Sequence, residues 1–220
     1  MNKLFRLLAS ATFILAASNG ALAVDIDAGP IWNDGDAKQK CPAVCSGLEW
    51  NGNWKTTVPD KMSVCSCDMP SSGGYFKLTT QFRERSNECL EGNQVNGSRN
   101  GASYMDRCQS VSGQSWKATS AGNGYFKLTT QFRESQNECL EGNQVGGSRN
   151  AAAFMDKCQN VSGQLWKVIP AGNGYFKLTT QFRERQNECL EGNQVNGLMN
   201  GAAFMDKCQN VSGQLWKLVK

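Results

Sequence analysis

The sequence repeats one pattern of apolar and polar residues three times, with a period of 50 residues. Each copy opens with YFKLTTQF, where Phe76, Leu78 and Phe82 of the first copy fall on one side of an extended chain. This alternation predicts a half-buried strand over 75–82. The shorter runs ASYMDRC and QSWK predict further strands in each copy, and the loop EGNQVNGSRNG is too rich in glycine and asparagine for a helix.

Three copies of such a unit predict a closed barrel with threefold pseudo-symmetry. A propeller needs at least four blades, and the end repeats of a solenoid differ from the others. Here the second and third copies differ at only five of 44 aligned positions, so neither has the character of an end cap. The two cysteines of each copy are 19 positions apart, which favours three disulfides within the copies: Cys89–Cys108, Cys139–Cys158 and Cys189–Cys208.

Ahead of the repeats, residues 24–69 predict a strand, a helix and two more strands. The run VDIDA alternates, Asn33 or Asp34 can cap a helix, and NWKTTV and MSVCSC alternate after the turn signal NG. The Pro-, Ser- and Gly-rich residues 70–74 form a linker to the repeats, which occupy residues 75–220. The expected fold class is therefore mainly β, with a small strand-helix-strand-strand module followed by the three repeats.

The four cysteines of this module are placed to link its helix to its sheet. Cys41 and Cys45 are four apart and share a helical face. Cys65 and Cys67 are two apart and share a strand face. Two disulfides between these pairs would support a core that is too small to fold unaided, and the spacing leaves the pairing open. A zinc site built from the four thiolates is the alternative.

The N-terminus and the composition indicate an exported, soluble protein. Residues 1–23 combine Lys3 and Arg6 with an apolar run and the small-residue site ALA, the layout of a secretory signal peptide. Ten cysteines suit disulfides in a secreted or periplasmic protein, and no later apolar run reaches membrane-spanning length. The sequence has no histidine, and its net charge of +4 comes without a basic run, so we expect no metal, no other cofactor and no nucleic-acid partner.

Each repeat carries its two cysteines and ends in Gln-x-Trp, as in Gln114-Ser115-Trp116. In these features the repeats resemble the ricin-B-type β-trefoil lectins. The resemblance implies a three-repeat β-trefoil whose core buries Trp116, Trp166 and Trp216. It also implies a sugar site in each repeat.

That sugar site is only partly preserved. Glu91 stands where the family has an Asp, and Tyr104 and Asp106 stand where it has a Gln and an aromatic residue. Glu91, Asn93 and Asp106 nevertheless recur in every copy. The candidate carbohydrate-binding residues of the repeats are therefore Glu91, Asn93, Asp106, Glu141, Asn143, Asp156, Glu191, Asn193 and Asp206.

Three blocks of the N-terminal module carry a second resemblance: AGPIW at 28–32, NGNWKTT at 51–57 and MSV at 62–64. With these blocks it resembles one module of the cyanobacterial mannan-binding lectins, although Lys55 replaces a Thr and the module occurs once rather than in tandem. An aromatic ring that covers the C–H face of a sugar, beside amide and hydroxyl groups, suits a saccharide. The candidate residues here are Trp32, Asn53, Trp54 and Thr56.

We therefore expect a secreted, multivalent lectin without enzymatic activity, whose partners are glycans or glycoproteins of the mannose-rich or N-glycan-core type. Repeated weak sites gain avidity. A glycosidase instead needs a fixed pair of carboxylates, for which Glu91 and Asp106 are the candidates. The main alternative is a non-sugar surface-attachment or interaction protein, and a glycoside hydrolase ranks behind it.

Overall fold

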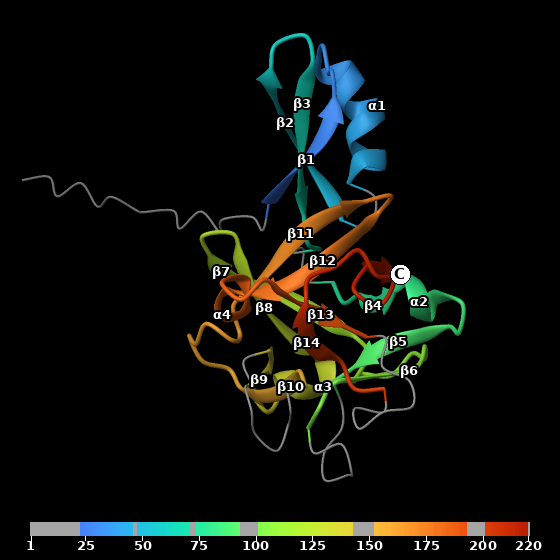
Figure 1. Cartoon of the computed structure of the whole chain (residues 1–220), viewed down its shortest axis with the longest axis vertical. Helices are drawn as coiled ribbons and strands as arrows, with labels where there is room; N and C mark the ends of the chain where they lie inside the picture. The colour runs from blue at the N-terminus through green and yellow to red at the C-terminus, as the bar shows by residue number, and fades with distance from the viewer. Residues whose placement is uncertain are drawn as a thin grey trace, which may run out of the picture.

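The computed structural model describes residues 23–45, 48–70, 74–92, 101–142, 152–192 and 201–219. They form a mainly β protein in which a small N-terminal module stands on a larger body built from the three repeats (Figure 1). The expected signal peptide, apart from Ala23, and most of the expected linker lie outside the described residues.

The module has the predicted strand-helix-strand-strand order. Its elements are β1 (Ala23–Gly29), α1 (Asp34–Val44), β2 (Glu49–Val58) and β3 (Met62–Asp68). The strands form an antiparallel sheet in the order β1-β3-β2. Asn33 caps the start of the helix: its side-chain oxygen accepts a hydrogen bond from the Asp36 N–H at 3.0 Å and so satisfies a donor there.

Two disulfides join the helix to the central strand, Cys41–Cys65 and Cys45–Cys67. The pairing that the spacing left open is thus the one that keeps the two bridges side by side. All ten cysteines of the chain lie in the described residues and all are disulfide-bonded. The zinc alternative is therefore wrong, because a disulfide sulfur is not a thiolate ligand.

The expected turn at Asn51-Gly52 is instead a bulge inside β2. Trp50 pairs with Cys67 and Trp54 with Cys65. Between these two pairs β2 therefore has two residues more than β3. Gly52 has a φ of 88°, a conformation that suits glycine. Because paired residues point to the same face of a sheet, both indoles lie on the face that the disulfides and α1 occupy.

The repeats form a β-trefoil. Six strands pair in the order β4-β15-β12-β11-β8-β7, and a bridge between Phe76 and Trp116 closes them into a barrel. These strands are β4 (Lys77–Thr80), β7 (Trp116–Gly122), β8 (Tyr125–Thr130), β11 (Trp166–Gly172), β12 (Tyr175–Thr180) and β15 (Trp216–Val219). Three hairpins complete the fold: β5 (Glu88–Glu91) with β6 (Tyr104–Arg107), β9 (Glu138–Glu141) with β10 (Phe154–Lys157), and β13 (Glu188–Glu191) with β14 (Phe204–Lys207). Each hairpin carries the predicted disulfide of its own repeat.

A ring of backbone hydrogen bonds connects the three repeats. Ser103 donates to Ala153, Ala153 to Ala203, and Ala203 to Ser103, each through its N–H to a carbonyl oxygen at 2.8 Å. All three residues are fully buried, so small side chains are needed where the repeats meet.

The tryptophans of the three Gln-x-Trp stretches form the barrel core, as predicted. Trp116, Trp166 and Trp216 are fully buried. Each indole N–H also donates to a leucine carbonyl of its own repeat at 2.8 Å, which satisfies the polar group that burial removes from water.

The predicted strand over 75–82 ends early, at Thr80. The Thr80 hydroxyl accepts a hydrogen bond from the Arg83 N–H at 3.2 Å, which caps a short helix in place of further strand. This helix is α2 (Gln81–Glu84), and its counterparts are α3 (Gln131–Glu134) and α4 (Gln181–Glu184). The prediction that Phe82 faces the core is therefore wrong, since 38% of its surface is exposed.

The arginine that follows this phenylalanine links neighbouring repeats. Arg133 is buried, its Nε donates to the Gly92 carbonyl of the first repeat at 2.8 Å, and its Nη1 pairs with Glu138 at 2.5 Å. Arg83 and Arg183 make the same two kinds of contact. Each repeat is thus bonded to its neighbour by a buried guanidinium.

The module and the trefoil share part of one core. Met69 is buried among the barrel residues, and Val24 and Leu48 pack against the same cluster. The hairpin of β11 and β12 reaches toward the module, and β11 contacts β1 (Figure 1). The module is therefore seated directly on the barrel.

Candidate functional site

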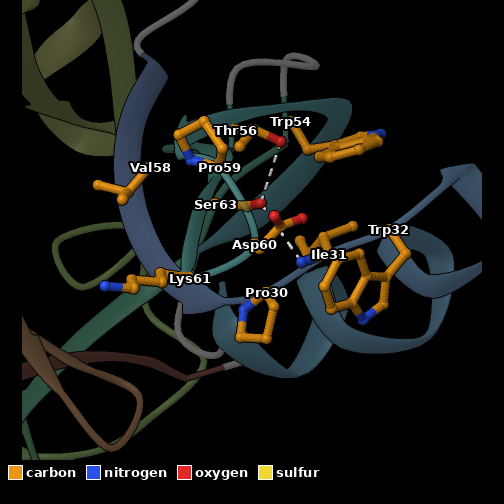
Figure 2. Close-up of a pocket in the computed structure, with 10 residues that line it drawn as sticks. All are labelled: Pro30, Ile31, Trp32, Trp54, Thr56, Val58, Pro59, Asp60, Lys61 and Ser63. Carbon is orange, nitrogen blue, oxygen red and sulfur yellow. Dashed lines mark hydrogen bonds between the residues drawn. The ribbon is translucent and has the colours of Figure 1, made fainter.

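A pocket of about 230 Å³ opens on the module, beside the hairpin of β2 and β3. Figure 2 shows the indoles of Trp32 and Trp54 at one side of this pocket and Val58 and Lys61 at the other. Three of the four residues predicted for the module line it, namely Trp32, Trp54 and Thr56.

The end of β1 fixes the exposed Trp32. Ile31 is buried, and its N–H donates to the Ser63 hydroxyl at 3.3 Å. The next residue, Trp32, therefore turns outward, and 61% of its surface is exposed. Its backbone N–H donates to the Asp36 carboxylate at 3.1 Å, which ties the main chain at Trp32 to the start of α1. A large aromatic ring that is exposed in this way is available for contact with a ligand.

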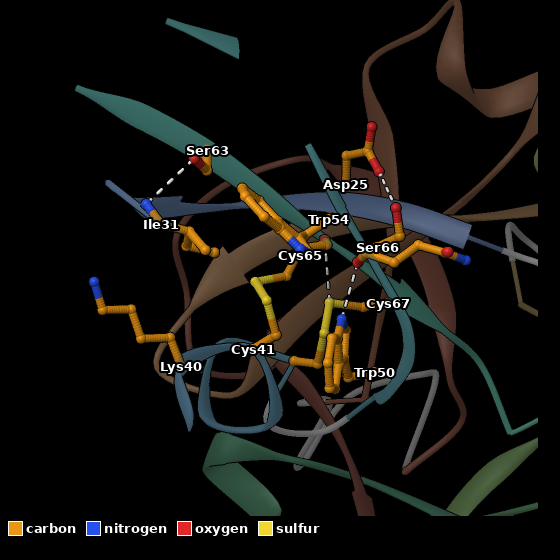
Figure 3. Close-up of a disulfide and its surroundings, with 12 residues drawn as sticks. Asp25, Ile31, Lys40, Cys41, Trp50, Trp54, Ser63, Cys65, Ser66 and Cys67 are labelled. Carbon is orange, nitrogen blue, oxygen red and sulfur yellow. Dashed lines mark hydrogen bonds between the residues drawn. A yellow bond between two sulfur atoms is a disulfide. The ribbon is translucent and has the colours of Figure 1, made fainter. Parts of the chain in front are cut away.

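Trp54 is fixed more firmly. Its indole N–H donates to the Asp34 carboxylate at 2.9 Å, and its ring packs against the module core. Figure 3 shows this ring beside the Cys41–Cys65 disulfide. On the same strand the Thr56 hydroxyl lies 3.4 Å from that of Ser63, in the pocket wall. A rigid ring and two hydroxyl groups thus share one wall.

The structure does not bring Asn53 into the pocket. Asn53 lies in the bulge of β2, where its N–H donates to the Asn51 side chain and its carbonyl accepts from the Trp50 indole at 2.9 Å. A residue that was not predicted, Asp60, does line the pocket, and Figure 2 shows it between the two sides. Only the fold shows that Asp60, in the turn between β2 and β3, lines the same pocket as the two tryptophans.

In the trefoil, the candidate acids of each hairpin share one face but not one environment. The register pairs Cys89 with Asp106 and Glu91 with Tyr104, which puts Glu91 and Asp106 on the same side. Glu91 is buried, whereas Asp106 is exposed and accepts a hydrogen bond from the next N–H, that of Arg107. The same holds for the exposed Asp156 and Asp206.

Gln114 of Gln-x-Trp accounts for the burial of Glu91. Its amide nitrogen donates to Glu91 at 3.0 Å and to the Arg107 carbonyl at 2.8 Å, and its oxygen accepts from the Gln109 N–H. Glu141 and Glu191 have the same partner in Gln164 and Gln214. These glutamates therefore hold their hairpins together. The other candidates of the repeats, Asn93, Asn143 and Asn193, lie outside the described residues.

A second group of polar residues recurs where one repeat meets the next. Glu134 binds Lys117 at 2.8 Å and also accepts the hydroxyl of Tyr75. The bonds from Lys117 and Tyr75 hold the pKa of the Glu134 carboxyl below its ordinary value. Lys167 and Tyr125 act in the same way on Glu184, and Lys217 and Tyr175 on Glu84, where burial opposes the lowering of the pKa.

Because of these three carboxylates, we expect the stability of the fold to decrease at acidic pH. Their folded-state pKa values lie below the ordinary 4.5, so they stabilise the fold above that pH and lose this contribution as the pH falls through the folded pKa. The triple variant Glu84→Gln, Glu134→Gln, Glu184→Gln should melt below wild type at pH 7, and the gap should close toward pH 3. Thermal melts across this range test it, and a gap that stays constant would contradict the assignment.

The chain resembles known proteins in two respects. The chain joins a disulfide-linked module to a β-trefoil, the fold of ricin B-like lectins, and residues 34–67 match the mannan-binding protein family. The matched segment spans α1, β2 and most of β3, including Trp54. No curated protein matches the chain.

Solved structures resemble the repeat region in fold. The designed threefold-symmetric protein ThreeFoil superposes with a TM-score of 0.53 at 20% identity, over 67% of this chain and 99% of its own. A ricin B-like lectin of Macrolepiota procera, in complex with lactose, gives 0.51 at 14% identity, over 68% of this chain and 97% of its own. A mosquitocidal holotoxin gives 0.55 at 14% identity, over 70% of this chain but 19% of its own.

Two features are missing from the described part of the chain. None of its helices has the length and apolar character needed to cross a bilayer. Within the described residues, the cysteine, aspartate and glutamate side chains form no group of three that could hold a metal ion.

Proposed function

We propose that this protein is an exported lectin that binds mannose-rich or N-glycan-core glycans in the pocket between Trp32 and Trp54. The observation that carries the proposal is the presence of two indoles in one pocket, that of Trp32 exposed and that of Trp54 fixed by Asp34. Trp54 also lies within the segment that matches the mannan-binding protein family. Five disulfides support export, since such bonds persist in oxidising compartments.

The lining of the pocket suits the two sides of a sugar ring. The indole faces can cover C–H groups, while the Thr56 hydroxyl and the Asp60 carboxylate can bond sugar hydroxyls. Asp60 is the only carboxylate among the described residues that line this pocket, whereas a glycosidase of the usual kind needs two. Binding without catalysis is therefore the proposed activity.

The contribution of the repeats is proposed to be separate and weaker. Among the described members of the predicted trefoil sites, Asp106, Asp156 and Asp206 are the exposed ones, whereas the glutamates are hydrogen-bonded to Gln114 and its counterparts. Several weak sites on one chain raise the avidity for a branched glycan by about 10²-fold or more. Because the glutamates are already hydrogen-bonded to glutamines, they also favour a second candidate function, in which the trefoil is an attachment module for a non-sugar surface.

Trp32→Ala should weaken mannan binding by about five- to thirty-fold. Stacking on an aromatic ring contributes about 1–2 kcal/mol, by analogy with base stacking, and Trp32 is so exposed that its loss should not disturb the fold. Calorimetric titration with a mannan oligosaccharide measures the change.

The matched control is Phe82→Ala, an exposed aromatic of the trefoil that is not among the residues lining the module pocket. Its mannan affinity should equal that of wild type, as should that of the triple variant Asp106→Ala, Asp156→Ala, Asp206→Ala. Equal affinities of wild type and Trp32→Ala would place mannan binding elsewhere or remove it from the function.

A further inference from the structure

A second pocket lies at the junction of the first and third repeats, and none of the predicted site residues that the structure describes lines it. Its volume is about 620 Å³, within the range of small-molecule sites. Residues 81–82 and 84–86 of the first repeat form one side, and Tyr175 and Ser212 of the third repeat form the other. We call this pocket the junction cleft.

Two aromatic rings line the junction cleft, and each has a cationic side chain over its ring. The Arg83 guanidinium carbon lies 5.4 Å from the centroid of the Phe82 ring, which leaves the exposed part of that ring for the cleft. Tyr175 donates its hydroxyl to Glu84 at 2.5 Å, and the Lys217 ammonium lies 5.9 Å from its ring centroid. A ligand that meets these rings does not have to order them, which lowers the entropic cost of binding.

One residue distinguishes this junction from its two counterparts. In the second and third repeats, Gln136 and Gln186 accept hydrogen bonds from the arginines beside the phenylalanines, at 3.2 and 3.3 Å. The first repeat has Ser86 at this position, and a serine side chain is too short to reach across in the same way. Phe132 and Phe182 are half-buried, while 38% of the surface of Phe82 is exposed.

The junction cleft also carries positive charge. Its one carboxylate among the described lining residues, Glu84, is already paired with Lys217 at 2.8 Å. The other charged residue of the lining is Arg85, which is exposed and has no ion pair with any described residue. A guanidinium of this kind is suited to a carboxylate, which it can bind through two hydrogen bonds.

We infer that the junction cleft binds a saccharide that carries a carboxylate. The sugar ring lies on Phe82, its carboxylate pairs with Arg85, and its hydroxyls bond Gln81 and Ser212. This site is independent of the mannan pocket in position, in charge and in the class of sugar that it takes.

The variant Ser86→Gln tests the inference with little risk to the fold, because glutamine already occupies the same place in the other two repeats. The probe is lactose bearing N-acetylneuraminic acid, and lactose itself is the uncharged match. In calorimetric titration or ligand-observed NMR, wild type should bind the acidic sugar at least five-fold more tightly than lactose. Ser86→Gln, Phe82→Ala and Arg85→Gln should each lose at least five-fold of this affinity.

Phe182→Ala is the matched control in the third repeat and should retain the affinity of wild type for the acidic sugar. Absence of binding by wild type, equal affinity for lactose, or unchanged binding by Ser86→Gln would each overturn the inference. A mannan titration of the same proteins separates this result from the proposed function, because mannan binding depends on Trp32 and should be unchanged in all four variants.

Discussion

Replacement of both Cys45 and Cys67 by serine should unfold the N-terminal module and abolish mannan binding. The buried cluster between the helix and the sheet of this module comprises Ile31, Ala37 and the four bridged cysteines, so the disulfides make up most of that cluster. Loss of a native disulfide from a small domain costs about 2–5 kcal/mol, which a core of this size cannot replace. Chemical denaturation and mannan titration of the variant measure both consequences.

The double variant Cys139→Ser, Cys158→Ser is the matched control. It removes a disulfide of similar loop length from the trefoil, whose core is far larger and includes three buried tryptophans. We expect this control to lose stability but to bind mannan as wild type does. Mannan binding that survives in the module variant would show that its fold does not depend on the bridge.

The second large effect is expected from Arg133→Met, which should destabilise the trefoil by about 2–3 kcal/mol. The change keeps much of the volume but leaves the Gly92 carbonyl and the Glu138 carboxylate without their guanidinium partner. The cost is set below that of a fully buried pair because Glu138 keeps 19% of its side chain exposed. Urea unfolding of the full chain, followed by tryptophan fluorescence, gives the free energy.

Arg85→Met supplies the control for this measurement. Arg85 lies two residues after the equivalent Arg83, but it is exposed and makes no ion pair within the described chain. Its removal should leave the free energy of unfolding within about 0.5 kcal/mol of wild type, as for most surface substitutions. Equal losses in the two variants would show that the buried arginine does not connect the repeats.

The β-trefoil could be predicted because its determinants are local and occur three times. Each repeat is described by the spacing of two cysteines, such as Cys89 and Cys108, and by the position of one tryptophan, such as Trp116. The near-uniform threefold repetition of this pattern excluded a propeller and a solenoid. The prediction for Phe82 was wrong because alternation alone does not reveal that the Thr80 hydroxyl caps a helical turn. Two local preferences competed there, and the cap prevailed over the strand.

The candidate sites were predicted less completely, because their partners come from distant parts of the chain. Trp32 and Trp54 could be chosen from the sequence, but Asp60 joins them only through the β2–β3 turn. Glu91 was chosen because it stands at the position of the family's sugar-binding Asp, but its hydrogen bond to Gln114, 23 positions away, could not be predicted. Contacts of this kind depend on the register of the strands, which sequence patterns do not report.

The ring formed by Ser103, Ala153 and Ala203 bears on how such a chain can arise. Each hydrogen bond of the ring passes from one repeat to the next, as do the bonds made by the buried arginines. The covalent connection between repeats supplies none of these contacts. A gene that encodes one repeat would therefore encode a subunit able to close the same ring as a homotrimer, and tandem duplication would then need no new interface.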